Sequence, residues 1–394
     1  MFKLYKKLLK AYNEKTLIKK IITKIKPYFY GILLVILNKS KKNIKLHTPK
    51  IIEANTLDLH LASRIFESYK KMKLDEKKTL DLFKPSAMWQ LHIDKDYKII
   101  KESVETNDLN KFMFFLSNFG NWKDYLGIEN NALVKEYSKN FFLRKYLLNV
   151  VFGKQLELWK RFNNYKKDIS TLDLPIHGNQ IGVHIDDNFV VIGSFFNEII
   201  ASTLNSLIYK LKRPVISDLG GGYGKLAFYI LKEKKDFCFI DFDLPETLCL
   251  ASYYLMKTWP EKKTFLYGEE EYSQEKNNSY DLIFLPPFEI AKLTNNSIDL
   301  FINKNSLGEM NAEAVNNYLK YICKSTNYFF HMNHDIKRNV FQDGKKGLLG
   351  YEYPIDKKKF DLIFRDPILG HSAYLGELDL ENDIFMYLYK NIER

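Results

Sequence analysis

The residues best suited to chemistry in this sequence form a short loop that opens with an acid and continues through glycines: Asp218, Gly220, Gly221, Gly222 and Gly224. An apolar run precedes the loop, and a helix is predicted after it over residues 225–232. Glycines let the chain turn tightly and bring bare backbone against a ligand, as in nucleotide-binding strand–turn–helix units. Lys225 stands where the third glycine of the dinucleotide pattern belongs, so the loop departs from that pattern.

A second acid follows at a distance that suits ribose. The apolar segment 237–242 leads to Asp243, which lies 21 residues after Gly222. A carboxylate about 20 residues beyond such a loop can accept hydrogen bonds from both ribose hydroxyls. We expect Asp243 rather than Asp241 to have this role, and Pro245 to lie in the first turn of the next helix.

Both segments resemble known motifs. The acid-x-Gly-x-Gly-x-Gly loop resembles motif I of class I methyltransferases, and Phe-Asp-Leu-Pro at 242–245 resembles a string in plant-type small-molecule O-methyltransferases. The resemblance implies S-adenosylmethionine as cofactor, with Asp218 near its methionine end and Asp243 on its ribose. It also implies that glycines cradle the cofactor, namely Gly220, Gly222 and Gly224.

Four further strings resemble sugar O-methyltransferases of bacterial surface-polysaccharide biosynthesis: residues 177–179, 267–269, 303–310 and 330–334. This resemblance implies an enzyme that methylates a sugar hydroxyl of a surface glycan or its precursor. Two alternatives remain open. One is a methyltransferase for another hydroxyl, such as a phenol or a lipid head group. The other is a non-catalytic cofactor-binding subunit of a polysaccharide-assembly complex.

Two segments are candidates for the strand that carries the adenine contacts, residues 265–269 and residues 281–288. If the second is the third strand of the sheet, residues 296–302 form the fourth, and Pro287 lies beside the cofactor. Its Pro-Pro-Phe superficially resembles a loop of amino-group and DNA methyltransferases. Leu285 stands where that loop needs an amide or an acid, which argues against methylation of nitrogen.

Methyl transfer to a hydroxyl gains about 100- to 10,000-fold from a general base. Candidates follow the fourth and fifth predicted strands, at the edge of the sheet where ligands collect. We predict His334 as the base, with Glu309 as its orienting partner, as the base itself, or only as a cap of the next helix. Plant-type enzymes have Leu-His-Asp where this chain has Leu307-Gly308-Glu309, so the usual histidine is a glycine here. His331 lies on the opposite strand face from His334 and is expected in the core.

Two asparagines at predicted strand ends could bind ligands. Asn303 is predicted to contact the cofactor, and Asn333 suits sugar hydroxyls or the cofactor's carboxylate. No spacing among the nearby acids specifies a metal, so we predict none; these acids are Asp299, Glu309 and Asp335. The three cysteines also lack the spacing of a zinc site.

The elements that must position these residues change in type along the chain. Residues 1–50 form a basic arm, residues 51–170 a helical domain, and residues 171–394 the cofactor-binding domain. In the last of these, strands and helices alternate, which predicts a mostly parallel sheet covered on both faces. The predicted fold is therefore α/β, Rossmann-like and of the class I methyltransferase type, preceded by a helical domain.

The net charge of +12 is concentrated at one end of the chain. Residues 1–50 hold 14 lysines and one acid, whereas the remainder holds 46 basic and 47 acidic residues. Nucleic-acid enzymes more often spread their basic residues over a binding face, so we expect no nucleic-acid partner.

Residues 1–26 of the basic arm have an amphipathic helical pattern with nine lysines. The pattern predicts either peripheral binding to an anionic membrane or a helix packed on the protein's own body. The longest apolar run, residues 28–37, is about half of the ~20 residues that a membrane-spanning helix needs. We therefore expect a cytoplasmic protein, with the arm as a contact to the inner face of the membrane.

Overall fold

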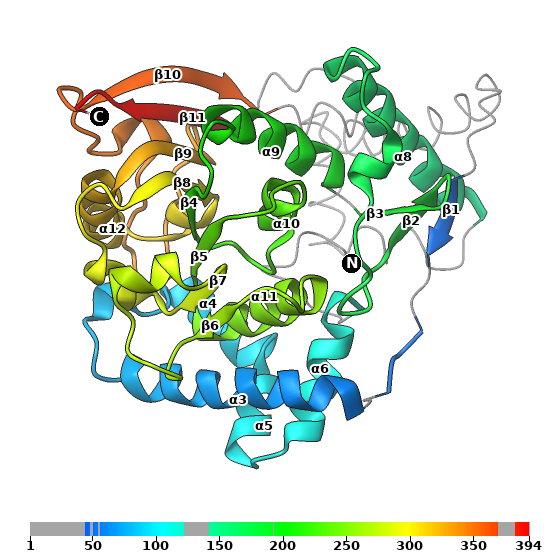
Figure 1. The fold of residues 1–394 in the computed structure, drawn as a ribbon, viewed down its shortest axis with the longest axis horizontal. Helices are drawn as coiled ribbons and strands as arrows, with labels where there is room; N and C mark the ends of the chain where they lie inside the picture. Colours follow the sequence, from blue (N-terminus) through cyan, green and yellow to red (C-terminus); the bar gives the residue numbers. More distant parts are fainter. Residues whose placement is uncertain are drawn as a thin grey trace, which may run out of the picture.

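The computed structural model of this chain describes residues 44–47, 50–53, 56–121, 142–191, 193–368 and 383–393. The arm predicted over residues 1–37 lies outside the described residues. A large mixed sheet forms the centre of the molecule, and a small antiparallel sheet lies to one side (Figure 1). No helix within the described ranges combines the length and apolar character needed to cross a membrane.

The large sheet has the strand order β10-β11-β9-β8-β4-β5-β7-β6. All neighbours are parallel except β11, which runs antiparallel to both β9 and β10. The strands are β4 (Val215–Leu219), β5 (Cys238–Phe242), β6 (Thr264–Leu266), β7 (Leu282–Leu285), β8 (Ile298–Lys304), β9 (Thr326–His334), β10 (Phe360–Pro367) and β11 (Ile384–Asn391). The chain leaves β4 toward β5 and later returns to β8 on the other side of β4. Ligands collect at such a switch point.

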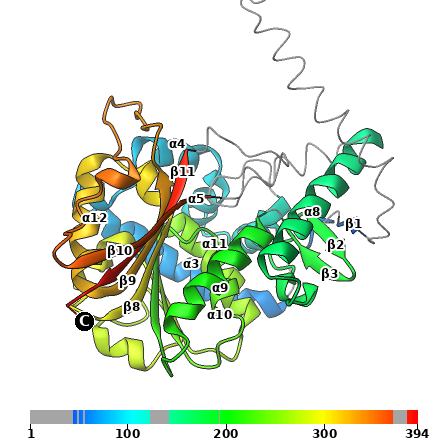
Figure 2. The same ribbon diagram turned by 90° about the horizontal axis from the view of Figure 1, so that it is seen from above.

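Successive residues of a strand point to opposite sides of the sheet, so each side of this sheet carries its own apolar core. Helices cover both of these faces. Phe239 and Leu282 belong to one apolar core, whereas Ile240 and Ile283 belong to the other. Three helices pack against the first face: α9 (Ser194–Ile208), α10 (Lys225–Leu231) and α11 (Pro245–Thr258). Helix α12 (Ala312–Ser325) covers the second face, as Figure 2 shows. The predicted Rossmann-like α/β fold is confirmed.

The helical region before the sheet is packed directly onto it. Its helices are α3 (Thr56–Glu76), α4 (Ala87–Lys95), α5 (Lys98–Glu105) and α6 (Leu109–Asn118). Residues of α3 and α6 share one apolar core with α11 and the sheet, so the core crosses the predicted boundary at residue 170. Ion pairs join α3 to the same part: Lys257 Nζ is 2.7 Å from Asp58 Oδ2, and Arg64 Nε is 2.8 Å from Glu269 Oε1.

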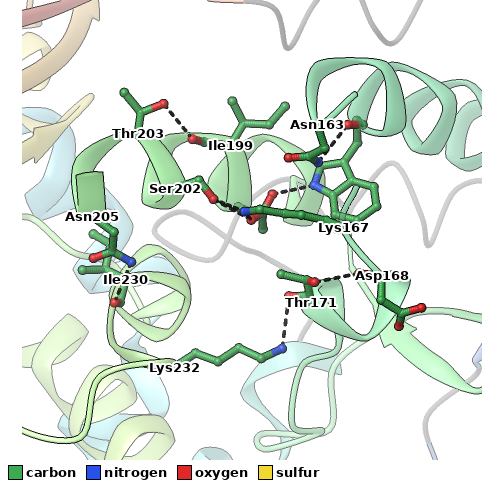
Figure 3. Close-up of polar contacts among 12 residues, drawn as sticks. Asn163, Lys167, Asp168, Thr171, Ile199, Ser202, Thr203, Asn205, Ile230 and Lys232 are labelled. Atoms are coloured by element: carbon green, nitrogen blue, oxygen red, sulfur yellow. Dashed lines mark hydrogen bonds and ion pairs between the residues drawn. The ribbon is translucent and has the colours of Figure 1, made fainter. Parts of the chain in front are cut away.

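A polar network attaches the small sheet and its helix to α9. The small sheet consists of β1 (Ile44–His47), β2 (Gly182–Ile185) and β3 (Asn188–Val190), and α8 (Phe142–Phe162) lies beside it. Glu198 of α9 is buried, accepts a hydrogen bond from Trp159 Nε1 at 2.5 Å, and pairs with Lys167 (Figure 3). Lys232, just after α10, donates to the carbonyl oxygen of Thr171. These contacts tie the segment before β2 to α9 and to the end of α10.

The structure settles which strand follows β5 in the sheet. Both candidate strands are present, but β7 pairs with β5, and β6 lies outside β7 at the edge. The segment 281–288 is therefore the third strand of the parallel series, and β8 is the fourth. Pro287 follows β7 directly, in the 3-10 helix η5 (Pro287–Lys292), and so lies near the end of β5.

Candidate active site

The turn after β4 has a backbone shape that favours glycine. Gly220, Gly222 and Gly224 have φ angles of 78°, 64° and 91°, in the left-handed region. A Cβ atom on Gly220 would lie 2.4 Å from the side chain of Ser306, in the 3-10 helix η6 (Ser306–Glu309). The turn therefore packs against the segment after β8 without room for a side chain.

Asp218 lies in β4, just before the turn, and is almost fully buried. Its Oδ1 atom has no hydrogen-bond partner among the described residues. Burial raises the pKa of Asp218 to about 7, and the nearby charge of Lys304 acts in the opposite direction. A buried carboxyl oxygen without a partner is unusual in proteins, and a ligand donor at this position would satisfy it.

Asp243 follows β5 and is hydrogen-bonded to the glycine turn. Its Oδ2 accepts from the Gly222 amide at 3.1 Å, and its Oδ1 accepts from the Leu244 amide at 2.7 Å. Burial raises the pKa of Asp243, while these two amides lower it. Each carboxylate oxygen can accept a further hydrogen bond, so the group remains able to bind a pair of hydroxyls.

Asp241 differs from Asp243 in its surroundings. It lies on β5 opposite Asp218, is fully buried, and has no hydrogen-bond partner for either carboxyl oxygen among the described residues. Burial, together with the carboxyls of Asp243 and Asp218, raises the pKa of Asp241 well above its usual range. Asp243 lines the cavity described next, whereas Asp241 does not. This placement agrees with the preference for Asp243.

A cavity of about 1100 Å³ lies over the ends of β4, β5 and β8. The glycine turn, η6, the end of α3 and the beginning of α4 all contribute to its lining. Of the residues predicted from the sequence, the cavity is lined by Asp218, Gly220, Gly222, Asp243, Pro287 and Glu309. Gly224, Asn303 and His334 do not line it.

Gly224 and Asn303 support the cavity from outside its surface. Gly224 is the N-cap of α10, and a Cβ atom there would lie 3.0 Å from the Leu255 side chain. Asn303 is fully buried and donates to the Leu219 carbonyl at 2.8 Å. Its Oδ1 accepts from Asn333 Nδ2 at 2.9 Å, and Asn333 Oδ1 accepts from the Gly308 amide at 2.8 Å. Both asparagines therefore join neighbouring loop segments by hydrogen bonds, and neither lines the cavity in which the sequence-based prediction would place Asn303.

His334 is also placed outside the cavity lining. Its Nδ1 lies 2.6 Å from Asp383 Oδ2, at the start of β11. A Cβ atom on Gly308 would lie 3.2 Å from His334 Cδ2, so the ring packs on the backbone of η6. His334 therefore contacts the segment that carries Glu309 from outside the cavity lining. His331 is fully buried and stacks on Tyr387 at a centroid distance of 4.6 Å, as expected of a core residue.

Glu309 lines the cavity and is held by a tryptophan from the helical region. Trp89 Nε1 of α4 donates to Glu309 Oε2 at 2.7 Å. Burial raises the pKa of Glu309, whereas the Trp89 hydrogen bond and the charges of His334 and His92 lower it. Asn311 caps α12 with its own side chain, which accepts from the Ala314 amide at 3.0 Å. The possibility that Glu309 serves as that cap is therefore excluded.

Sequence reasoning missed two residues that line the cavity, Trp89 and Lys304. Ser86 caps α4, because its side chain accepts a hydrogen bond from the Trp89 amide at 3.3 Å. A serine three residues before Trp89 is typical of a helix start, and this was the sequence feature that pointed to a helix carrying Trp89. Lys304 donates to Asn197 Oδ1 at 3.0 Å, and both residues line the cavity with Asp218. Only the fold brings α9 and the end of β8 together.

The acids considered for a metal are not gathered in one place. Asp299, near the start of β8, accepts from the Val215 amide at 2.9 Å, whereas Asp335 accepts from Tyr387 Oη at 2.7 Å. Glu309 lies beyond the opposite end of β8 from Asp299. Among the described residues, no group of three or more His, Cys, Asp or Glu side chains is arranged to hold a metal ion.

No protein-family model matches the sequence, and no curated protein matches it. Several solved structures are similar. The mitomycin 7-O-methyltransferase MmcR shares 12% identity over 50% of this chain and 56% of its own, with a TM-score of 0.30. The pyocyanin biosynthetic protein PhzM shares 12% identity over 50% and 56%, with a TM-score of 0.33. Geranyl diphosphate C-methyltransferase from Streptomyces coelicolor A3(2) shares 4% over 51% and 82%, with a TM-score of 0.34. The match thus spans little more than half the length of the first two, and similarity at this level assigns no activity to the chain.

Proposed function

We propose that this protein is an S-adenosylmethionine-dependent O-methyltransferase that acts on a sugar hydroxyl. One observation carries the proposal: a single cavity is lined both by the glycine turn with Asp218 and Asp243, and by the partly buried carboxylate of Glu309. Its volume of about 1100 Å³ lies slightly above the range of about 300–1,000 Å³ found for ordinary small-molecule sites. The cavity therefore has room for a cofactor and an acceptor together.

The residues present fit S-adenosylmethionine. Asp218 offers an unpartnered carboxyl oxygen to the ammonium group of the methionine part, and Lys304 suits its carboxylate. Asp243 is held by two backbone amides and can still accept from both ribose hydroxyls. Pro287 offers an apolar surface for the adenine. When bound, this cofactor supplies an electrophilic methyl carbon on a positively charged sulfur.

Glu309 is the group best placed to accept the proton of an acceptor hydroxyl. Trp89 donates one hydrogen bond to Glu309 Oε2. Both carboxylate oxygens of Glu309 can still accept further hydrogen bonds. Burial raises the pKa of Glu309, and a base works best when its pKa approaches the working pH. His334, our first choice from the sequence, does not line the cavity and is bound to Asp383. We therefore propose Glu309 as the base and His334 as a supporting residue outside the cavity lining.

The lining near Glu309 supports a sugar as acceptor. Trp89 provides an aromatic surface, and neighbouring polar groups can hydrogen-bond to hydroxyls: Ser86, Gln90 and Asn311. Specific sites for small polar molecules usually combine an apolar or aromatic wall with a few placed polar groups. The resemblance of the sequence strings to sugar O-methyltransferases points in the same direction.

The test is methyl transfer from methyl-labelled S-adenosylmethionine to two acceptor pools, surface-polysaccharide precursors of the source organism and simple phenols. Label in the sugar pool, in a product that resists mild alkali as an ether does, supports the proposal. Label only in phenols would identify the non-sugar alternative. S-adenosylhomocysteine binding by calorimetry, with no transfer to either pool, would identify a non-catalytic cofactor-binding subunit. Glu309→Gln is the matched inactive control, because it preserves the shape of the side chain.

A further inference from the structure

A series of contacts connects Glu309, the base proposed above, with residues of the helical region. Trp89 lies in the first turn of α4, where the Ser86 cap fixes its backbone. Its indole N–H donates to Glu309 Oε2 at 2.7 Å. This bond fixes one carboxylate oxygen and leaves the other for the acceptor. The orientation of Glu309 therefore depends on how firmly the Trp89 ring is held.

The Trp89 ring is supported by His92, one helical turn further on. The two rings meet edge to face, with centroids 6.1 Å apart and an interplanar angle of 74°. This lies within the range of favourable aromatic contacts. His92 does not line the cavity itself, so it can affect a bound acceptor only through Trp89 or through its charge.

His92 is fixed in turn by an acid at the end of the same helix. His92 Nδ1 lies 2.8 Å from Asp96 Oδ2, and the Asp96 side chain is only 4% exposed. This contact holds the His92 ring through its Nδ1 atom.

Charged groups from three elements act on Glu309. His92 approaches from α4, His334 from the end of β9, and Asp243 from the end of β5. Each of the two histidines that act on Glu309 is bound to its own aspartate. The remaining ionisable side chains of the cavity lining are Glu76, Lys77, Asp81, Lys84, Asp218, Tyr223, Lys225, Lys304, Tyr318, Asp343 and Lys345.

We propose that His92 is a positioning residue that holds the Trp89 indole against Glu309. When protonated, it also brings a positive charge near the carboxylate and favours the form that can accept a proton. In the reaction the acceptor O–H proton passes to Glu309, the new bond joins the acceptor oxygen to the methyl carbon, and sulfur keeps the electron pair of the bond that breaks. The kinetic part of this inference rests on the proposed function, whereas the contact between the two residues does not.

The spectroscopic test needs no acceptor. In protein labelled with ¹⁵N at the indoles, the Trp89 signal is identified as the one missing from Trp89→Phe. This signal should move with pH as Glu309 titrates, and Glu309→Gln should abolish that movement. His92→Gln should shift the midpoint to higher pH by about 0.5–1 unit, because a positive charge that favours the carboxylate is lost. His60→Gln, which changes an exposed histidine of the neighbouring helix α3, is the matched control and should shift nothing.

The kinetic test uses the same variants. His92→Gln should lower kcat at a pH below the midpoint by up to about tenfold, since one pKa unit changes the carboxylate fraction tenfold. The acid limb of the pH profile should move upward, and KM for the cofactor should stay unchanged. Asp96→Asn should have the same effect, which guards against a folding defect in one variant. An unshifted indole midpoint in both variants would overturn the inference; a shifted midpoint without methyl transfer to any acceptor would instead overturn the proposed function.

Discussion

Trp89 and Glu309 lie 220 residues apart in the chain, yet the indole nitrogen of the first is 2.7 Å from a carboxylate oxygen of the second. The contact joins α4 of the helical region to the turn after β8. Residues from the helical region thus complete the lining of a cavity whose floor belongs to the parallel sheet. We infer that the helical region is part of the site and not only an accessory to it.

Glu309→Gln is expected to lower kcat about 100-fold or more, because a neutral amide cannot take up the proton of the hydroxyl that is methylated. Affinity for S-adenosylhomocysteine should stay within a few-fold of the wild-type value. His334→Gln should cost much less, since His334 lies outside the cavity lining. Steady-state kinetics on both variants checks this ranking. A larger loss in His334→Gln than in Glu309→Gln would restore the histidine as the base.

Asp243→Asn is expected to weaken cofactor binding by about 1.5–3 kcal/mol, the range for losing hydrogen bonds to a charged group. The substitution keeps the size of the side chain but replaces one acceptor oxygen by a donor that faces an amide N–H or a ribose hydroxyl. Titration calorimetry with S-adenosylhomocysteine measures the change. Asp361→Asn, at an exposed position of β10, is the control and should bind normally. Equal affinities in the two variants would remove Asp243 from the ribose role.

Cofactor binding should be linked to proton release. Burial raises the pKa of Asp218 to about 7, so a sizeable fraction is protonated near neutral pH. Binding of the ammonium group to Asp218 favours the carboxylate and expels that proton. Affinity should therefore rise between pH 6 and pH 8, and calorimetry in buffers of different ionisation enthalpy should detect release at pH 7. Asp218→Asn should abolish most of it, and a wild-type affinity independent of pH would contradict the role.

The same residue has a stability consequence of opposite sign. Its pKa in the folded protein, about 7, lies above the value of ~3.9 for an unfolded chain. The protonated group therefore contributes stability below pH ~4, and this contribution is lost as the pH rises to 7. In the ligand-free protein, Asp218→Asn should flatten this part of the curve of unfolding free energy against pH. Denaturant titrations at several pH values measure the difference.

The part of the cavity around the glycine turn could be predicted because its signals are local. Asp218, the glycine turn and Asp243 belong to two successive strand–turn–helix units, whose spacing fixes where each carboxylate lies relative to the turn. The part of the cavity around Glu309, in contrast, depends on contacts between residues that are distant in the sequence. Nothing near Glu309 in the sequence indicates Trp89, and nothing near His334 indicates Asp383, which is 49 residues away. Asn303 shows a different limit, since a strand-end asparagine can equally bind a ligand or the neighbouring loop.

We also propose that residues 1–37 attach the protein to anionic membranes, because nine lysines accompany the amphipathic pattern of residues 1–26 and an apolar run follows at residues 28–37. Removal of residues 1–37 leaves β1 and its pairing with β2 in place, so the fold should persist. Sedimentation with vesicles that contain phosphatidylserine should be lost in the truncated protein, and the full-length protein should dissociate as salt is raised. Equal sedimentation of both forms, or none by either, would count against the attachment.

Gly220→Ala is expected to destabilise the protein and to abolish cofactor binding. Two costs add at this position: a φ of 78°, which an L-residue adopts only with strain, and a Cβ that would lie 2.4 Å from Ser306. Gly344 allows the cost of strain to be measured without the cost of overlap. It has a φ of 77°, but no atom lies within 4 Å of the position that a Cβ would take. Gly344→Ala should therefore lower the free energy of unfolding by about 1 kcal/mol, the cost of strain alone. Gly220→Ala should lower it by clearly more, since the turn must also move away from η6.

Thermal unfolding of the two variants, with and without S-adenosylhomocysteine, measures both effects. The ligand should raise the Tm of wild type and Gly344→Ala but not that of Gly220→Ala, and a normal ligand response in the latter would show that the close packing of the turn on Ser306 is not required for binding.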